Sequence, residues 1–479
     1  MGVRRSEGIF IKWNIQIEFT PDRNKPIRID VGTITRPIAD LHPEQIGLSL
    51  EEGRQLLRRV QFEVVKAQAR AYELCRRRCA ECRRPRPIKD IRTKCVQTLF
   101  GAFRLRGRRF HSCRCRSRPD ELSQDFPLGE IIPRRTTPEV RFLFAELGAT
   151  MPYRAASRVL RSCGFADMRA SHRTIRRYTV ELGQTLESQR LDATHPGQTS
   201  ECASSMVVGI DDTYVRHHKR DAARQLQVTA GRLERNGQLG ARFAFIASSA
   251  SWKPAQFKGF LEQQGQREST ATRIITDGDD GLRNVVQRNI PTIADMQLDW
   301  FHIGMRLENL RKSVSMPKSY DEWRASLHSP NPRRDRVSKL RDALWRGRSW
   351  RALLQVARLR CDVDRWEAEG PHHSTDAADR TRKTIDEFRK YVCGNRRGLP
   401  DFAKERAAGR RISTAHVESV MNHLVNHRLS KRQQMRWSPE GAHYLFQVRA
   451  ELLNGSLLDS YRIDHPRFRA PSQLSAALH

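Results

Sequence analysis

The sequence predicts a multidomain α+β fold, and three observations along its 479 residues support that prediction. Paired cysteines lie in an Arg-rich segment near residue 100, and three capped helical patterns follow them. From residue 205, three strand patterns precede alternating helix and strand patterns, which is the order of an RNase H-like fold. We therefore expect an N-terminal zinc ribbon and helix-turn-helix, followed by an RNase H-like α/β catalytic domain with an all-helical insertion.

These patterns divide the chain into six segments. An N-terminal sheet plus helix is expected over residues 1–70, a zinc-ribbon-like DNA-binding segment over 71–130, and a helix-turn-helix-like domain over 131–190. A linker over 191–204 leads to the catalytic domain at 205–455, with its helical insertion at about 303–409, and to a flexible tail at 456–479.

Composition points to nucleic acid as the partner. The formal net charge is +33, and the 87 lysine and arginine residues are spread along the whole chain. Such a surface suits a phosphate backbone. An anionic membrane is the alternative, but no apolar run approaches the ~18 residues that a membrane span needs. We therefore expect a DNA-binding protein without a membrane partner, and the ten cysteines suggest a reducing compartment.

Four cysteines have a spacing typical of a metal site. Cys79 and Cys82 form a C-x2-C pair, and Cys113 and Cys115 form a second close pair about thirty residues later. We expect one structural zinc ion, which would fold a segment too small to build its own core. Cys75 and Cys95 compete as ligands, so the fourth ligand stays open, and free thiols in a basic linker are the alternative.

The helical patterns after the cysteines are typical of a helix-turn-helix. One helix begins at Thr137, a second covers residues 153–160, and Ser171 caps a third, HRTIRRYTVEL. Three arginines near the start of the third helix are expected to contact DNA: Arg173, Arg176 and Arg177. The alternative is a plain helical connector with a solvated basic face.

Acidic residues follow two apolar strand patterns. The stretch SMVVGIDDTYVRH runs into Asp211 and Asp212, and RIITDG ends on Asp277. Adjacent strands lie roughly 4.8 Å apart, so carboxylates at neighbouring strand ends can bridge a metal ion. A helical pattern over residues 413–425 carries Glu418 as a third acid. Solvated turns or helix caps would also explain such acids, and Asp212 can replace Asp211 as the first ligand.

The segment after the last predicted strand, MQLDWFHI, becomes helical and highly charged. In this strand Asp299 rivals Asp277 as a ligand, whereas His302 is more consistent with a satisfied buried histidine than with a catalytic one. The tryptophans of the insertion are expected in its core, with base stacking as the alternative. They are Trp323, Trp345, Trp350 and Trp366.

A basic stretch, SKRQQMRWS, follows the helix of Glu418. It combines cations with an aromatic residue, so we expect it to hold DNA beside the acidic residues; a solvated basic loop is the alternative. The expected contact residues are Lys431, Arg432, Arg436 and Trp437.

Six sequence fragments between about residues 45 and 450 carry a family resemblance. They are LSLEEGRQLLRRVQFEVVKAQ, TLFGAFRLRGRRF, GIDDTYVR, TDGDDGLRNV, LDWFHIGMRLENL and AHVESVMNHLVNHRLSKRQQMRWSPEGAHYLFQVR. In this order and combination they resemble the ISKra-type family of bacterial insertion-sequence DDE transposases.

The resemblance implies a catalytic triad of Asp211, Asp277 and Glu418 that binds two Mg²⁺ ions. Two such ions, about 4 Å apart, activate the attacking oxygen and stabilise the leaving oxygen at a phosphate. A transposase of this kind nicks the ends of its element and joins the freed 3′-hydroxyl to target DNA. The implied partners are double-stranded DNA and a second copy in a homodimer assembled on DNA, in the bacterial cytoplasm at the nucleoid.

Two other functions fit the same residues. A zinc-dependent DNA-binding regulator would have kept the transposase-like fold without cleaving DNA. A structure-specific Mg²⁺-dependent nuclease would use the same triad to cut without joining. The mutual distances of the three carboxylates are the observation that best separates an enzyme from a regulator.

Overall fold

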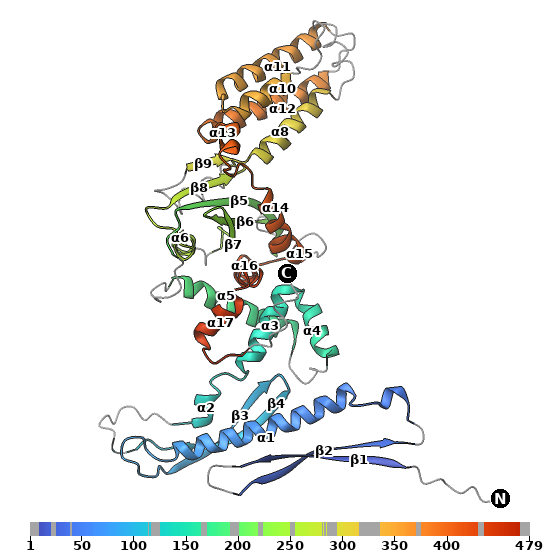
Figure 1. The fold of residues 1–479 in the computed structure, drawn as a ribbon, viewed down its shortest axis with the longest axis vertical. Helices are drawn as coiled ribbons and strands as arrows, with labels where there is room; N and C mark the ends of the chain where they lie inside the picture. The colour runs from blue at the N-terminus through green and yellow to red at the C-terminus, as the bar shows by residue number, and fades with distance from the viewer. Residues whose placement is uncertain are drawn as a thin grey trace, which may run out of the picture. The chain divides into compact units, whose positions relative to one another are not determined.

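The computed structural model describes most of the chain, and its elements form two compact units (Figure 1). One unit consists mainly of residues 1–179 and 461–477, and the other of residues 180–460. The described residues are 9–20, 25–38, 41–113, 115, 125–163, 170–191, 201–218, 224–249, 254–279, 281, 284, 295–315, 336–369, 375–429 and 435–469. The predicted mixed α+β class is confirmed.

The first unit begins with a hairpin and a long helix. Strands β1 (Phe10–Phe19) and β2 (Ile27–Pro37) pair antiparallel, and α1 (Leu50–Arg76) follows a short 3₁₀ turn, η1 (Pro43–Gln45). Ser49 and Glu52 form a capping box at the start of α1, which satisfies backbone donors that the first turn leaves free. Glu52 also pairs with Arg36 at 2.6 Å, so the cap joins the hairpin to the helix.

A second hairpin packs on α1. Strands β3 (Ile88–Thr98) and β4 (Gly101–Phe110) pair antiparallel, and α2 (Pro127–Ile131) follows. Alternate β4 residues are buried, because successive side chains of a strand point to opposite faces. The small core contains Val96, Phe103, Leu105 and Leu128, packed against Phe62, Val65 and Ala69 of α1.

Helices complete the first unit. These are α3 (Pro138–Thr150), α4 (Tyr153–Ser162), the first turns of α5 (His172–Leu191) and α17 (Leu457–Asp464). Phe142 packs edge-to-face against Tyr461, with ring centroids 5.0 Å apart, so the C-terminal helix belongs to this core. The Ser171 hydroxyl accepts from Thr174 N at 3.2 Å, which places the start of α5 where the sequence predicts it.

The second unit is built on one five-stranded sheet of order β7-β6-β5-β8-β9. Its strands are β5 (Ser205–Arg216), β6 (Gln225–Arg235), β7 (Gln238–Phe245), β8 (Ala271–Thr276) and β9 (Asp295–Leu298). The first three are antiparallel, and β8 and β9 run parallel to β5. Phe257 and Phe260 of α6 (Pro254–Gln263) pack on Phe243 of β7. The predicted helix GLRNVVQR lies mostly outside the described residues.

The last strand is shorter than predicted. The sequence pattern extended it through Ile303, but β9 ends at Leu298 and α8 (Trp300–Ser315) begins two residues later. Asp299 accepts a hydrogen bond from Phe301 N (2.8 Å), so it caps the helix and ends the strand. The apolar pattern could not show this, because a short apolar run fits a strand and a buried helix equally well.

An all-helical segment follows, with its own core (Figure 1). It contains α8, α10 (Arg336–Trp345), α11 (Ser349–Glu369), α12 (Thr375–Gly394), η2 (Arg396–Gly398) and α13 (Phe402–Ala407). The chain then returns to the sheet through α14 (Ala415–Val420), the π-helix η3 (Met421–Asn426), α15 (His427–Leu429) and α16 (Pro439–Asn454). The second half of α5 packs on α16, where Glu187 bonds the buried His443 at 2.6 Å.

Candidate functional site

Asp211 and Asp212 lie inside β5, not at its end as the sequence pattern suggested. The strand continues to Arg216, and its pairing with β6 is unbroken across both acids: Asp211 lies opposite Ala230, and Asp212 opposite Thr229. The Thr, Tyr and Val that follow favour strand structure, which explains the continuation. Because side chains alternate along a strand, the two acids point to opposite faces of the sheet. Only one of them can therefore face a given ligand.

Asp277 follows directly after β8, and its charge acts on Asp211. The β5–β8 pairing ends with Gly209 opposite Ile275, two residues before each acid, so Asp211 and Asp277 both lie beyond the same end of this pairing. Burial raises the pKa of Asp211; the nearby His302 opposes this, and the charge of Asp277 adds to the rise. A cation bound beside Asp211 would oppose this rise in its pKa.

The loop after Asp277 has little steric freedom. Gly278 has φ +84°, and a Cβ there would lie 2.6 Å from Leu298 Cδ2 and 2.9 Å from Asn395 Oδ1. Only glycine fits this position without strain. Asp277 Oδ1 accepts from Asp279 N at 2.9 Å, so a local turn orients the carboxylate.

Asp299 connects three elements near these acids. It is fully buried and accepts hydrogen bonds from Phe301 N at the start of α8 and from both Thr414 N (3.1 Å) and Thr414 Oγ1. His302 Nδ1 lies 2.7 Å from Asp299 Oδ2, the oxygen that also accepts from Thr414 Oγ1. Although burial opposes ionisation, these hydrogen bonds lower the pKa of Asp299. Asp299 therefore joins the end of β9 to the residue that precedes α14.

His302 interacts with the charges of Asp211 and Asp277 as well as with Asp299, to which it is hydrogen-bonded. Burial disfavours its charged form, but the hydrogen bond to Asp299 and the charges of Asp211 and Asp277 raise the pKa of the imidazole. The expectation of a satisfied histidine agrees with its Asp299 contact. The bond between Asp299 and Thr414 was missed, because 115 residues separate the two in sequence.

We expect Thr414→Val to lower the free energy of unfolding by about 2 kcal/mol, because the buried Asp299 carboxylate loses a hydroxyl donor. Urea denaturation measures this loss. Thr414→Ser keeps the hydroxyl and is the matched control. Equal stability of the valine variant and the wild type would contradict the role assigned to this contact.

The helical insertion supplies two further residues near Asp277. Tyr391 of α12 donates its hydroxyl to the Asp277 carbonyl oxygen at 3.1 Å, and the Arg306 guanidinium carbon lies 4.2 Å from the centre of the Tyr391 ring. Burial raises the pKa of Tyr391, so its hydroxyl stays protonated and keeps donating. No sequence motif marked either residue; only the topology brings α8 and α12 to this edge of the sheet.

Glu418 lies on α14, which packs on β5 and β6. Val417 and Val420 are buried, whereas Glu418 is exposed. The π-helix η3 follows immediately, and such turns are frequent at functional sites. Buried Arg449 donates to the carbonyl oxygens of Leu424 (2.7 Å) and His423, which satisfies acceptors in that turn.

The three predicted carboxylates do not meet at ligand distance. Within the described part of the chain, Asp211, Asp277 and Glu418 do not form a group whose ligand atoms all lie within 4.8 Å of one another. The charge of Asp277 acts on Asp211, and α14 packs on β5, the strand of Asp211, and on β6. The carboxylate oxygens present are donors that suit Mg²⁺. Asp212 Oδ2 accepts from Gln227 at 2.6 Å, while its buried Oδ1 has no hydrogen-bond partner among the described residues.

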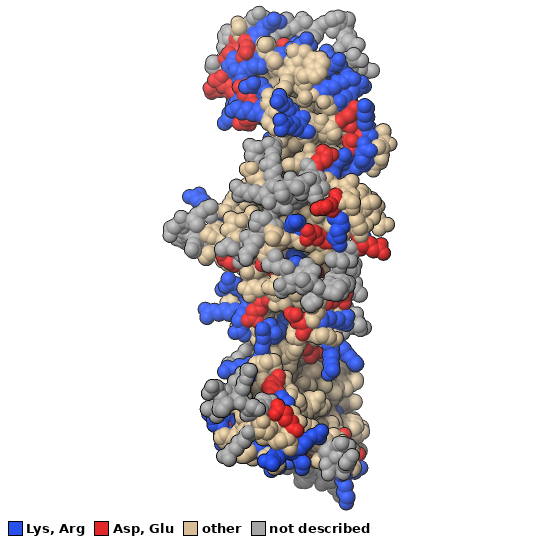
Figure 2. Space-filling model, turned by 90° about the vertical axis from the view of Figure 1, so that its left-hand side faces the viewer, with Lys and Arg blue, Asp and Glu red and all other residues tan. Residues whose placement is uncertain are grey.

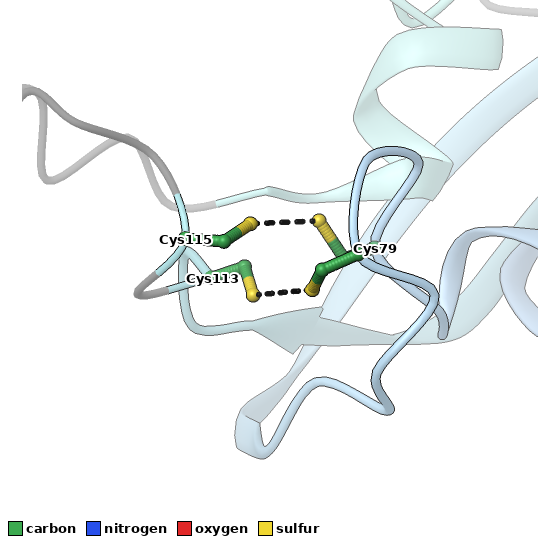
Figure 3. A group of neighbouring side chains, drawn as sticks. Cys79, Cys113 and Cys115 are labelled. Atoms are coloured by element: carbon green, nitrogen blue, oxygen red, sulfur yellow. Dashed lines mark hydrogen bonds between the residues drawn. The ribbon is translucent and has the colours of Figure 1, made fainter.

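The four predicted cysteines form the one such metal-binding group among the described residues (Figure 3). Their sulfur atoms all lie within 4.8 Å of one another, with Cys79 and Cys115 at 3.5 Å and Cys82 and Cys113 at 3.3 Å. A zinc tetrahedron with bonds of about 2.3 Å has sulfur–sulfur edges of about 3.8 Å. The group can therefore hold a metal ion such as zinc.

Local structure positions these cysteines. The C-x2-C pair lies in a tight turn after α1, closed by Arg83 N to Cys79 O (3.1 Å), and the second pair directly follows β4. Backbone hydrogen bonds from Cys82 and Glu81 lower the pKa of Cys79 to about 6, which favours the thiolate that binds metal. Cys75 and Cys95 are exposed and lie outside the group, so they do not compete as ligands in this structure.

A comparison with known families covers most of these features. Residues 45–331 match the model of an uncharacterised protein family, UPF0236. The chain belongs to this family. No curated protein matches it. The matched range contains the four cysteines, Asp211, Asp277 and Asp299, and it ends before Glu418.

The predicted DNA-contact arginines of this UPF0236 chain begin α5. Arg173 and Arg176 are exposed. Arg177 is also exposed, and it stacks on Tyr178 with its guanidinium carbon 4.8 Å from the ring centre. The side chains of Arg173 and Arg176 are therefore accessible to a ligand, whereas Arg177 is partly held by its neighbour.

The basic stretch after η3 is only partly described. Lys431 and Arg432 lie outside the described residues, and Arg436 is exposed. Trp437 is only 4% exposed, because its backbone bonds the end of β5 through Arg216 O (2.9 Å). The expected DNA contact by Trp437 therefore does not agree with its position in the core. The combination of charged and aromatic residues in SKRQQMRWS could not show that Trp437 contacts the end of β5, because the two lie far apart in the sequence.

The tryptophans of the insertion divide into core and surface. Trp366 is buried, and Trp345 packs on Trp300 with ring centroids 4.7 Å apart. Trp350 is 63% exposed at the start of α11, with the Arg351 guanidinium carbon 5.0 Å from its ring centre. Trp323 lies outside the described residues.

No described helix is both long and apolar enough to cross a membrane.

Proposed function

We propose that this protein is a DDE-type DNA transposase that binds the ends of an insertion sequence and catalyses metal-dependent strand cleavage and strand transfer. The observation that carries the proposal is that Asp211 and Asp277 both lie just beyond the same end of the β5–β8 pairing, close enough for the charge of Asp277 to raise the pKa of Asp211. The sheet around them has three antiparallel strands followed by two parallel ones, which is the order expected for an RNase H-like fold. The resemblance of the sequence to ISKra-type transposases supports the same function.

Each acidic residue has a stated role in this proposal. Asp211 on β5 and Asp277 after β8 bind the catalytic Mg²⁺ ions, and Glu418 is the third ligand, carried by α14, which packs on β5 and β6. Bound Mg²⁺ supplies activation of the attacking oxygen and charge stabilisation at the leaving oxygen. Asp299 positions this helix through Thr414, and His302 holds the orientation of the Asp299 carboxylate through Nδ1.

The surface supports DNA as the substrate. On the exposed face of β4, three arginines recur at every second residue: Arg104, Arg106 and Arg108. They form a basic row that fits a DNA backbone, although Arg108 also pairs with Glu73 at 3.5 Å. Figure 2 shows lysine and arginine side chains distributed over the visible face. Exposed Trp350 beside Arg351 adds a surface on which an unpaired base can stack.

Replacing Arg173, Arg176 and Arg177 together by alanine should weaken binding to double-stranded DNA. Each lost phosphate contact is expected to flatten the slope of log affinity against log salt by roughly one unit. Binding isotherms at several salt concentrations measure this slope. The triple lysine variant keeps the charge, so its slope should stay close to that of the wild type. An unaltered slope for the alanine variant would mean that the start of α5 is only a connector.

A DNA-binding regulator with a structural zinc ion is the second candidate. This function does not need the three acids to meet, and among the described residues they do not form a group within 4.8 Å. A third candidate, a nuclease, needs all three ligands together, as a transposase does. A strand-transfer assay with a labelled DNA end, Mg²⁺ and a circular target separates the three functions. A transposase joins the end to the target, a nuclease only shortens it, and a regulator leaves it intact.

A further inference from the structure

Helix α1 has an apolar surface that faces away from its own core. The structure describes all residues of α1, and none of them is buried. Phe62, Val65 and Ala69 pack on the β3–β4 hairpin. The β1–β2 hairpin also lies against α1, where Leu56 approaches Gly32. Four large apolar side chains of α1 are still between 43% and 63% exposed: Leu50, Leu57, Val64 and Leu74. A helix that is apolar on two sides normally has a partner on each side.

The exposed surface follows a seven-residue repeat. One set of positions recurs every seven residues from Leu50, and a second set recurs every seven residues from Gly53. The residues are Leu50, Leu57, Val64 and Ala71 in the first set, and Gly53, Val60, Ala67 and Leu74 in the second. This spacing is that of the a and d positions of a coiled coil, in which a second helix lies along the seam. We call these eight residues the α1 seam.

We propose that the α1 seam binds the α1 seam of a second copy of this chain as an antiparallel coiled coil, so that the protein is a homodimer without DNA. Antiparallel pairing can set Leu57 against Leu74 of the second copy and Val64 against Ala67 of the second copy. The paired segment is then about 27 Å long at ~1.5 Å per residue. The proposal is independent of the transposase function, because it concerns the free protein.

Charge complementarity selects the second copy and its register. In the antiparallel register just given, Glu63 beside the seam faces Arg70 of the second copy, and the two-fold axis repeats this ion pair. Within one chain Glu63 contacts Lys66 at 3.0 Å, and Arg70 has no acidic partner among the described residues. Shifting the register by one heptad, so that Leu50 meets Leu74, would set Glu63 against Glu63. A parallel pair would set Glu63 against Gln68.

The positions of small residues along α1 also fit antiparallel pairing of two α1 helices. The centre of the paired segment contains the small residues Ala67 and Ala71, which let two helices approach, and the leucines lie at its ends. A closed, self-complementary interface of this kind has two-fold symmetry and stops at two copies. A dimer is therefore expected, not a filament.

Sedimentation velocity of the full-length protein without DNA tests the proposal. At tens of micromolar we expect a species of about twice the monomer mass of 55.4 kDa. Leu57→Glu with Val64→Glu should give the monomer, with unchanged circular dichroism because both side chains are already exposed. Ile91→Glu is the matched control, since Ile91 is 52% exposed on β3 of the same unit, and it should leave the dimer intact.

Charge reversal tests the register. Glu63→Arg alone or Arg70→Glu alone should each raise the dimer dissociation constant about tenfold, because the two ion pairs between the partly covered Glu63 and the exposed Arg70 become two like-charge pairs. The combination of Glu63→Arg and Arg70→Glu should restore it. A monomeric wild type, or an unchanged dimer in the Leu57→Glu, Val64→Glu variant, would overturn the interface. Failure of the combined reversal to restore the dimer would overturn the antiparallel register.

Discussion

Asp277→Asn is expected to reduce Mg²⁺-dependent cleavage of a DNA end by more than about a hundredfold. Changes to residues that only support a metal ligand already cost 10- to 100-fold, so the loss of a ligand itself should cost more. Affinity for double-stranded DNA should stay within about twofold, because backbone contacts elsewhere on the basic surface supply it. The measurements are a cleavage time course with Mg²⁺ and a binding isotherm without it.

Asp279→Asn is the matched control for this variant. Asp279 is exposed, lies two residues further along the same loop, and accepts a hydrogen bond from Gly281 N at 2.7 Å. Its amide should preserve most of the cleavage. Cleavage by Asp277→Asn at the wild-type rate would exclude Asp277 as a metal ligand, and equal loss in both variants would point to a general disturbance of the loop.

Metal analysis of the full-length protein is expected to find about one zinc ion per chain, and Cys79→Ser should lose it. Backbone hydrogen bonds lower the pKa of Cys79 to about 6, which favours its thiolate form. The metal would hold the turn after α1 against the end of β4, two segments with few apolar contacts of their own. Amide hydrogen exchange of residues 77–113 should therefore accelerate in the variant and after chelation.

Cys75→Ser and Cys95→Ser serve as controls for the zinc experiment. Both residues are exposed and lie outside the group of four sulfurs, so their variants should retain the metal. A wild-type protein purified under reducing conditions without bound metal would end the zinc assignment. Loss of zinc from the Cys95 variant would mean that the ligand set differs from Cys79, Cys82, Cys113 and Cys115.

Local sequence determined the features whose causes are themselves local. The spacing of the cysteine pairs identified the metal-binding group, because two short turns suffice to present each pair. Ser171 marked the start of α5 through a hydrogen bond three residues away. The apolar run before Asp277 marked the end of β8, and the charged helical pattern after residue 300 marked the insertion.

Tertiary structure decided where these elements meet. The length of β5 depends on its pairing with β6, which extends past Asp211 and takes both acids into the strand. Trp437 is in the core because its backbone bonds the end of β5, more than two hundred residues earlier. Asp299 caps α8 and holds Thr414 across 115 residues, a contact that no periodic pattern contains.

The same distinction applies to the acidic site and to α1. Sequence identified Asp211, Asp277 and Glu418 as candidates, but only the strand register places Asp211 and Asp277 beyond the same end of the β5–β8 pairing, and only the packing of α14 leaves Glu418 exposed. The heptad spacing of α1 is present in the sequence, but it does not distinguish a helix that is covered on two sides by its own chain from a helix with one side free to bind a second copy. Exposure in the folded unit distinguishes the two cases, because side chains already covered by their own chain cannot bind a second copy.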